Sequence, residues 1–267
     1  MEIGYSWDVG LLRELNEDSI LCVRFDIKAA SRLVSAGLFA VADGMGGHNA
    51  GEIASDLAIR TFYSSCLSEL LGEPPAAPLS ALATAFNEAN RKVLDCASDR
   101  NLRGMGTTLT AALVIEGDLY VVHVGDSRCY IINDRETLQV TKDHSVVQEL
   151  VDAGVITSEQ ARSHPRRNEL TRVLGYYRDV VPDLYYMKLY AGDDILICSD
   201  GLCSVLSSDK IAAAVLSSPS PSQACMDLTA QANLAGGPDN ISVIIARPDN
   251  LPSWQAVVAA ETTIRRL

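Results

Sequence analysis

Four aspartates share one context: each lies close to a glycine where an apolar run begins or ends. Asp43 and Asp200 close apolar runs, Asp126 interrupts one, and Asp239 precedes another. Short apolar runs bounded by turn residues are typical of buried strands, so these carboxylates are expected at rigid strand ends. Carboxylate oxygens are the ligands that hard divalent cations such as Mg²⁺ and Mn²⁺ prefer, so the pattern indicates a metal site.

Such a site would have a definite chemistry. Two cations about 3.5–4 Å apart can share one water and lower its pKa, which suits in-line attack on a phosphate ester. Arg13 could bind phosphate oxygens at two points, and Glu17 and Asp18 follow it in a polar turn. Alternatively, these residues form a charged surface hairpin and the aspartates simply occupy turns. Spacing alone leaves both interpretations open.

Glycines follow Asp43, and cysteines and histidines elsewhere in the chain offer other chemistries. Gly44, Gly46 and Gly47 are expected to let the backbone turn tightly towards a ligand. Cys129 and Arg135 match the bare spacing of a cysteine phosphatase loop, but the residues between them favour a strand and a packed thiol. His123 lies in an apolar run and is expected to be structural. The other histidines lie in polar regions, where an imidazole could shuttle protons: His48, His144 and His164.

Composition restricts the class of protein. With 267 residues and 48% hydrophobic content, the chain can form one large domain or two small ones. A net charge of -12 disfavours nucleic acid or an anionic membrane as the main partner. The seven cysteines are irregularly spaced and are expected to be free thiols in a reducing compartment. No signal peptide or membrane span is apparent in the sequence, so a cytoplasmic protein is expected.

Periodicity and turn residues predict the elements that must position these side chains. Residues 3–25 are expected to be extended around a polar turn, 26–36 to be loop-like, and 50–71 and 80–96 to be helices, the second capped by Ser80. Residues 107–141 are expected to form an antiparallel meander, and 184–189 to pair with 195–198. Further helices are expected over 145–153, after Thr157, and over 208–217 and 221–234, followed by a strand over 241–246. The basic stretch 164–175 is either a surface connection or a flap over an anionic substrate.

Eight motifs, in order over residues 1–247, resemble the metal-dependent Ser/Thr protein phosphatases of the PP2C type in their bacterial form. They are Arg13-x-x-Asn16-Glu17-Asp18, Val41-Ala42-Asp43-Gly44-Met45-Gly46-Gly47-His48, Gly106-Thr107-Thr108, Val124-Gly125-Asp126-Ser127-Arg128, Thr141-x-Asp143-His144-Ser145, His164-Pro165-x-x-Asn168-x-x-Thr171-Arg172, Ser199-Asp200-Gly201 and Asp239-Asn240. Singly most are weak, whereas jointly they are highly specific.

The resemblance implies an α+β fold: a four-layer α/β/β/α sandwich with two central antiparallel sheets. It implies a phosphatase domain over residues 1–247. The Ala/Val-rich tail over 248–267 lies outside the resemblance and could form a peripheral helix. The resemblance also implies two Mn²⁺ or Mg²⁺ ions, with a third possible. The implied ligands are Asp43 bridging both ions, the Gly44 carbonyl on one, Asp200 and Asp239 on the other, Asp18 with Glu17 holding metal-bound waters, and Asp126 on the third.

The resemblance further implies that Arg13 orients the phosphate and that a flap over about 145–180 borders the site. Ser145, His164 and Arg172 are the flap residues expected to bind substrate. Met45 stands where many eukaryotic members have a histidine proposed as general acid, so a metal-bound water or His48 could take that role.

The implied activity is hydrolysis of phosphoserine and phosphothreonine in proteins. The implied protein is a soluble monomer that reverses the action of a bacterial Ser/Thr kinase. The alternatives are a non-catalytic binding module with the same fold and a metal-dependent phosphatase acting on small phosphoesters.

Overall fold

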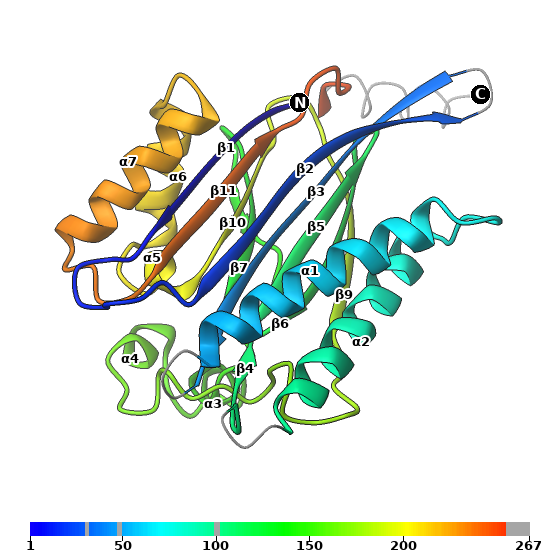
Figure 1. Ribbon diagram of the computed structural model, residues 1–267. Coiled ribbons are helices and arrows are strands. Elements are labelled where there is room, and N and C mark those ends of the chain that lie inside the picture. Colours follow the sequence, from blue (N-terminus) through cyan, green and yellow to red (C-terminus); the bar gives the residue numbers. More distant parts are fainter. Residues whose placement is uncertain (30–31, 47–49, 99–101, 255–267) are drawn as a thin grey trace.

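Two antiparallel sheets lie face to face at the centre of the structure, with helices packed on both outer faces (Figure 1). This computed structural model describes residues 1–29, 32–46, 50–98 and 102–254. The strands of the first sheet, in spatial order, are β1 (Glu2–Asp8), β11 (Ile241–Arg247), β10 (Asp194–Cys198), β7 (Arg128–Ile132) and β8 (Thr137–Gln139). Those of the second are β2 (Asp18–Ala29), β3 (Arg32–Met45), β5 (Leu109–Ile115), β6 (Asp118–Val124) and β9 (Asp183–Lys188), with β4 (Gly106–Thr107) paired to the end of β3.

Helix pairs cover the two outer faces. The second sheet is covered by α1 (Ala50–Leu70) and α2 (Pro78–Cys96), and the first by α5 (Asp200–Cys203), α6 (Ser208–Ser217) and α7 (Pro221–Leu234). Two short helices, α3 (Val146–Asp152) and α4 (Ser158–Arg162), lie at one end of the sandwich, at the bottom of Figure 1. The predicted four-layer α/β/β/α arrangement is confirmed.

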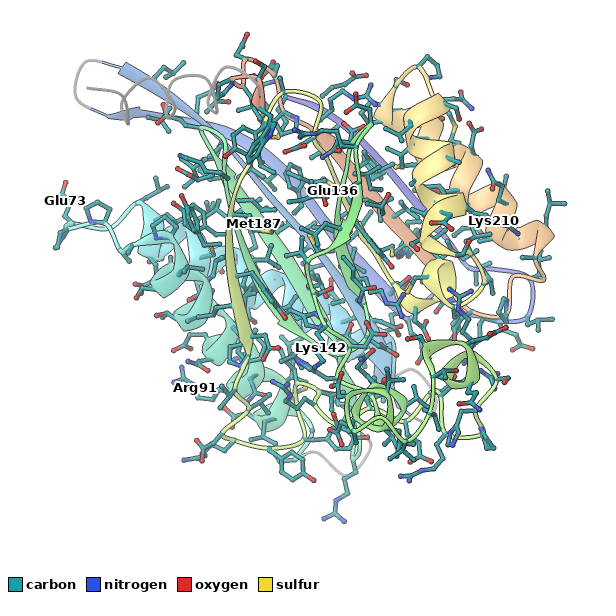
Figure 2. The ribbon with its side chains drawn as sticks, turned by 180° about the vertical axis from the view of Figure 1, so that it is seen from behind. Glu73, Arg91, Glu136, Lys142, Met187 and Lys210 are labelled. Atoms are coloured by element: carbon teal, nitrogen blue, oxygen red, sulfur yellow. The ribbon has the colours of Figure 1, made fainter. Side chains whose placement is uncertain are left out.

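Successive side chains of the central strands point to opposite faces, so these strands contribute to three hydrophobic cores. In β3, Leu38 and Ala40 face the helices, whereas Phe39 and Val41 face the other sheet. Because both faces are covered, the strand is a continuous apolar run, as the sequence predicted. Side chains fill the space between all four layers (Figure 2). This packing holds the ends of β3 and β10, and hence their aspartates, in fixed positions.

The predicted meander is right for the β5–β6 and β7–β8 pairings but wrong in joining β6 to β7, and the predicted 184–189/195–198 pair is wrong. Strand β6 pairs with β5 and β9 in the second sheet, whereas β7 pairs with β10 and β8 in the first. The chain crosses between the sheets at Gly125, whose φ of 114° is accessible chiefly to glycine. Likewise, β9 and β10 lie in different sheets. Periodicity identifies a strand, but it does not distinguish two sheets that share one interior.

Three other boundaries differ from prediction. Residues 26–36 are not loop-like, because β2 extends as far as Ala29, β3 begins at Arg32, and the two strands pair with each other. The second helix begins at Pro78 rather than at a Ser80 cap, since proline presets the φ that a first helical residue needs. The short helix α5 directly after Ser199 was not predicted. The helices over 208–217 and 221–234, and the Thr157 cap, are confirmed.

The start of the C-terminal tail packs against the sandwich. Ala191 N–H donates to the Pro252 carbonyl at 3.0 Å, and the rings of Tyr190 and Trp254 meet edge to face at 4.8 Å between centroids. The tail helix that the sequence suggested falls mainly on residues 255–267, outside the described residues. Within the described part, no helix is both long and apolar enough to cross a bilayer.

Strand β1 packs so closely on α7 that one added methyl group should destabilise the fold. A Cβ on Gly4 would lie 2.2 Å from the Pro221 carbonyl carbon. Gly4→Ala should therefore lower the free energy of unfolding by roughly 1–3 kcal/mol in urea titrations. Tyr5→Thr, an exposed position on the same strand, should stay within about 0.5 kcal/mol of the parent. Equal stability of the Gly4 variant and the parent would contradict this packing.

Candidate metal centre

The four aspartates singled out in the sequence line one cavity of about 200 Å³ at the end of the sandwich near α3 and α4. Asp43 lies near the end of β3, Asp126 in the β6–β7 crossing, Asp200 directly after β10, and Asp239 shortly before β11. The cavity is lined by Arg13, Glu17, Asp43, Gly44, Met45, Gly46, Thr108, Asp126, Asn168, Leu170, Asp200 and Asp239. Strand ends from both sheets therefore bring together carboxylates that are up to 196 residues apart in the chain.

Glycine is required beside two of these aspartates because backbones from separate segments touch there. A Cβ on Gly44 would lie 2.1 Å from the Gly51 carbonyl oxygen, and one on Gly201 would lie 1.9 Å from that of Asn240. Gly44 does not turn the chain, as was expected, but remains in β3 and pairs with Thr107. The absence of a side chain thus lets α1 begin directly above Asp43.

Asn240 holds the segment that carries Arg13, a role that the sequence did not reveal. Its Nδ2 donates to the carbonyls of Val9 and Leu15 at 3.0 and 2.9 Å, and its Oδ1 accepts from Glu17 N–H at 2.8 Å. One side chain therefore fixes the segment between β1 and β2 against the start of β11. The only signal in the sequence was an asparagine directly after Asp239.

Arg13 extends over the cavity and is half exposed, with 49% of its side-chain surface accessible. Its Nη2 donates to Asp239 Oδ2 at 2.8 Å, and this hydrogen bond raises the pKa of the guanidinium further. A planar guanidinium at a cavity mouth can bind two oxygens of a tetrahedral anion. The predicted phosphate-orienting residue is therefore present beside the carboxylates.

The carboxylates raise one another's pKa. Burial raises the pKa of Asp18 to about 7, with smaller contributions from Asp200 and Asp239. Burial and the charge of Asp239 raise the pKa of Asp200 to about 6. Burial and neighbouring aspartates also raise the pKa of Asp43 and of Asp126. Without a cation, the folded protein therefore disfavours full ionisation of this site.

Unpartnered oxygens show that the site fits a cation. Both carboxylate oxygens of Asp18, which is 3% exposed, lack a hydrogen-bond partner, as do Asp200 Oδ1 and Glu17 Oε1. Buried acceptors of this kind are costly unless a donor or a cation compensates them. A donor set made only of oxygen suits Mg²⁺ or Mn²⁺.

The side chains are not already arranged as a closed cage. Among the described residues, no three His, Cys, Asp or Glu side chains are gathered closely enough to form a ready metal site, and Asp239 is turned to Arg13. Cations that retain several waters need few protein ligands each, so an open cavity is compatible with them. Asp18 does not line the cavity but lies buried behind it, where water could link it to a cation.

Of the predicted flap residues, the structure brings only Ser145 towards the site. Ser145 caps α3, accepting from Gln148 N–H at 3.3 Å, and lines a second cavity beside the first. His164 and Arg172 line neither cavity, since Arg172 donates to Asp183 Oδ1 at 2.8 Å and His164 accepts from Arg166 N–H. Asn168 and Leu170, which the sequence analysis did not select, line the first cavity instead.

The histidines divide by role. His123 is buried and bonded to the Thr110 hydroxyl at 2.8 Å, and burial lowers its pKa to about 3, which confirms a structural role. His144 Nδ1 accepts from Gly125 N–H at 3.1 Å and so braces the crossing that carries Asp126. Its Nε2 lies 3.2 Å from Asp183 Oδ2, so both ring nitrogens have partners, and His144 lines neither cavity. His48 is outside the described residues.

Cys129 is a packed core thiol. It is fully buried, and burial raises its pKa to about 12, so it is not a thiolate near neutral pH. All seven cysteines are free, as the sequence predicted. The spacing between Cys129 and Arg135 therefore has no catalytic meaning.

Asp18 should destabilise the metal-free fold in a pH-dependent way. A raised carboxyl pKa adds stability only at low pH, and this stability is lost as pH rises through the folded-state pKa, here about 7. Metal-free Asp18→Asn should therefore unfold with a free energy more than ~1 kcal/mol above that of the parent at pH 8. This advantage should shrink between pH 7 and 5. Urea titrations with chelator at each pH measure it, and a pH-independent difference would contradict the assignment.

Comparison with known proteins agrees with this geometry. A family model described as protein phosphatase 2C matches residues 15–234. The serine/threonine protein phosphatase PstP of Mycobacterium tuberculosis is 42% identical over 243 residues, which are 90% of this chain but 43% of that protein. A putative protein phosphatase 2C-type of Streptococcus pyogenes is 35% identical, over 94% of this chain and 98% of that protein.

Thus the chain spans less than half the length of the mycobacterial relative and nearly all of the streptococcal one. Among solved structures, the catalytic domain of PstP in complex with 2 manganese ions superposes with a TM-score of 0.76 at 37% identity, covering 91% of this chain and 96% of that one. With a family model matching most of its length and relatives of this similarity, the chain belongs to the protein phosphatase 2C family.

Proposed function

We propose that this protein hydrolyses phosphoserine and phosphothreonine in proteins, using a water activated at a centre of two Mn²⁺ or Mg²⁺ ions. The observation that carries the proposal is the single cavity lined by four aspartates and Arg13, with buried carboxylate oxygens that lack partners. The named activity of the relatives and the two manganese ions of the PstP catalytic domain support it.

The acidic residues and the Gly44 carbonyl would hold the cations in different ways. Asp43 would bridge the two cations, the Gly44 carbonyl would bind one of them, and Asp200 and Asp239 the other. Asp18 and Glu17 would hold cation-bound waters from behind the cavity, and Asp126 would contribute to a third cation. Bound in this way, the cations would lower the pKa of a water and neutralise charge on the phosphoryl oxygens.

The chain's own groups orient the substrate. Arg13 projects over the cavity from a segment fixed by Asn240, so its guanidinium can hold two phosphoryl oxygens and set the line of attack. Met45 lines the cavity and carries no exchangeable proton, so the side chain directly after Gly44 cannot protonate the departing serine or threonine oxygen.

Partners and location follow from the proposed chemistry. Phosphoproteins are the substrates, and a Ser/Thr protein kinase whose phosphorylation this enzyme reverses is the proposed counterpart. Free cysteines support a reducing compartment, so we propose a cytoplasmic site of action. We further propose that residues 1–247 act as a monomeric catalytic domain.

Phosphate release should depend on the metal. With Mn²⁺, the protein should release phosphate from a phosphothreonine peptide far faster than from a nucleoside monophosphate, and chelator should abolish the activity. Asp200→Asn should lower the rate at least about 100-fold because it removes a ligand. Asp56→Asn, an exposed position on α1, is the matched control and should leave the rate unchanged. Full activity after chelation would refute the proposal, and a preference for the nucleotide would favour a small-phosphoester phosphatase.

The geometry of Arg13 should matter as well as its charge. A lysine keeps the charge but cannot bind two oxygens in one plane, so Arg13→Lys should lower kcat/KM about 10- to 100-fold at saturating Mn²⁺. Arg91→Lys, on the outer helix α2 (Figure 2), replaces another acid-paired arginine far from the cavity and should have no effect. Steady-state kinetics on one phosphopeptide compare the two. Equal losses in both variants would remove Arg13 from the proposed role.

A further inference from the structure

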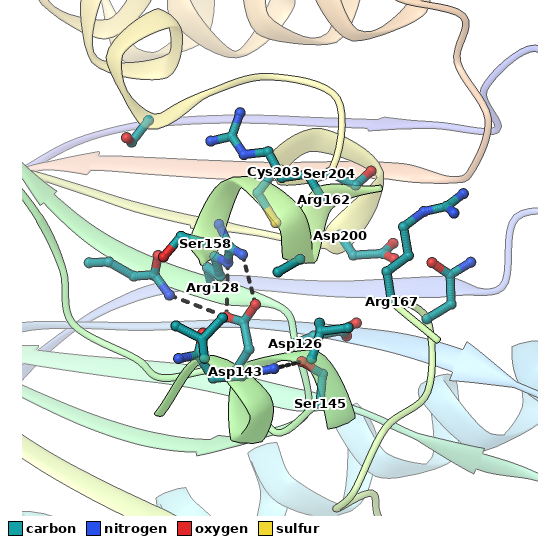
Figure 3. Close-up of a pocket in the computed structure, with 17 residues that line it drawn as sticks. Asp126, Arg128, Asp143, Ser145, Ser158, Arg162, Arg167, Asp200, Cys203 and Ser204 are labelled. Carbon is teal, nitrogen blue, oxygen red and sulfur yellow. Dashed lines mark hydrogen bonds and ion pairs between the residues drawn. The ribbon is translucent and has the colours of Figure 1, made fainter. Parts of the chain in front are cut away.

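A second cavity, of about 290 Å³, lies next to the metal cavity, and we call it the flap cavity. It is enclosed by α3, α4 and the segment after α4 on one side and by α5 and the start of α6 on the other (Figure 3). Asp126, Asn168 and Asp200 line both cavities, so the two lie side by side. A substrate whose phosphate occupies the first cavity can therefore extend a neighbouring side chain into the second.

The lining of the flap cavity is rich in hydrogen-bond donors. Three arginines reach it from separate parts of the chain: Arg128 from β7, Arg162 from the last turn of α4, and Arg167 from the segment beyond. Hydroxyls and amides complete the polar lining: Gln139, Ser145, Gln148, Ser158, Asn168, Ser204 and Ser208. Such donors are the groups that bind phosphate in proteins.

The charges of this cavity are only partly balanced within the protein. Arg128 is neutralised by Asp143, to which it donates twice, from Nε at 2.9 Å and from Nη2 at 2.7 Å. Arg162 and Arg167 have no ion pair with any residue of the described part of the chain. The remaining acids of the lining, Asp126 and Asp200, also face the metal cavity, where cations would offset them.

Two unpaired arginines are notable in a chain of net charge -12 that otherwise pairs many of its basic groups. Arg166, directly beside Arg167, donates to Glu169 from Nε and Nη2 at 2.9 and 2.7 Å and lines neither cavity. Both adjacent arginines are exposed, but only Arg167 lines the flap cavity, and it has no acidic partner among the described residues.

We propose that the flap cavity binds a second phosphate on the same substrate segment, held by Arg162 and Arg167. The enzyme would then prefer polypeptides in which two phosphorylated residues lie close together. This inference rests on the proposed function, because the first phosphate must occupy the metal cavity. A phosphate carries more charge and more acceptor oxygens than a carboxylate, so it matches a pair of free guanidinium groups better.

Kinetics on matched peptides test the preference. Each peptide carries one cleavable phosphothreonine and, at a neighbouring position scanned over a few residues, either a non-hydrolysable phosphonate analogue of phosphoserine, an aspartate or an alanine. At the best position, kcat/KM should be at least about 10-fold higher with the phosphonate than with alanine, and higher than with aspartate. The variant carrying both Arg162→Gln and Arg167→Gln should reduce this gain to below twofold. Its activity on the alanine peptide should be unchanged.

Arg166→Gln is the matched control, since it removes an equally basic neighbour outside the cavity and should keep the full gain. A gain that is absent in the parent, or that persists in the double variant, would overturn the proposal. An equal gain from aspartate would overturn the assignment to phosphate.

A binding measurement separates this proposal from the proposed catalytic function. Peptides with phosphonates at one or at both positions cannot be turned over, so their dissociation constants in Mn²⁺ report recognition alone. The doubly modified peptide should bind at least about 10-fold more tightly to the parent and to Arg166→Gln, but not to the double variant. Equal affinities for the two peptides would refute the flap-cavity site even if the enzyme is an active phosphatase. Lack of turnover with the expected affinity difference would count against the proposed function alone.

Discussion

Mutual repulsion among buried carboxylates is the constraint on which the rest of this structure depends. Burial raises the pKa of Asp18, Asp43, Asp126 and Asp200, and at least one neighbouring aspartate raises the pKa of each further. Segments that carry like charges would move apart unless something else held them. The four-layer sandwich opposes this separation, because the strands that hold or flank Asp43, Asp126 and Asp200 bury apolar side chains on both faces. Burial elsewhere therefore keeps together groups that would otherwise separate.

Close backbone contacts and side-chain hydrogen bonds then fix where the segments that carry Arg13 and the aspartates lie. Gly44 and Gly201 allow contacts between chain segments that any side chain would prevent. Asn240 joins the Arg13 segment to the start of β11 through three hydrogen bonds. His144 does the same for the crossing between the sheets. Together these four residues set the distances over which Arg13 and the aspartates can act on one substrate.

The sequence predicted the local features well and the long-range ones poorly. Aspartate beside glycine at the end of an apolar run marked Asp43, Asp126 and Asp200 because strand ends and turns are local signals. The pairing of β6, β7, β9 and β10 could not be predicted from the sequence, since the alternation of side-chain hydrophobicity is the same for strands of either sheet. The donor role of Asn240 and the location of Arg162 and Arg167 depend on contacts between distant segments. Arg172 was selected by its motif but binds Asp183, a partner that only the fold reveals.

The ion pair between Arg13 and Asp239 has a consequence for the order of assembly. Asp239 Oδ2 accepts from Arg13 at 2.8 Å, and that oxygen cannot bind the guanidinium fully and serve a cation at the same time. If Asp239 bound a cation through that oxygen, as proposed, Arg13 would lose its internal partner and would become available to an incoming phosphoryl group. Cation and substrate would then favour each other's binding by the same factor, as thermodynamic reciprocity demands. The ion pair with Asp239 would thus keep Arg13 from binding substrate until cations occupy the metal centre.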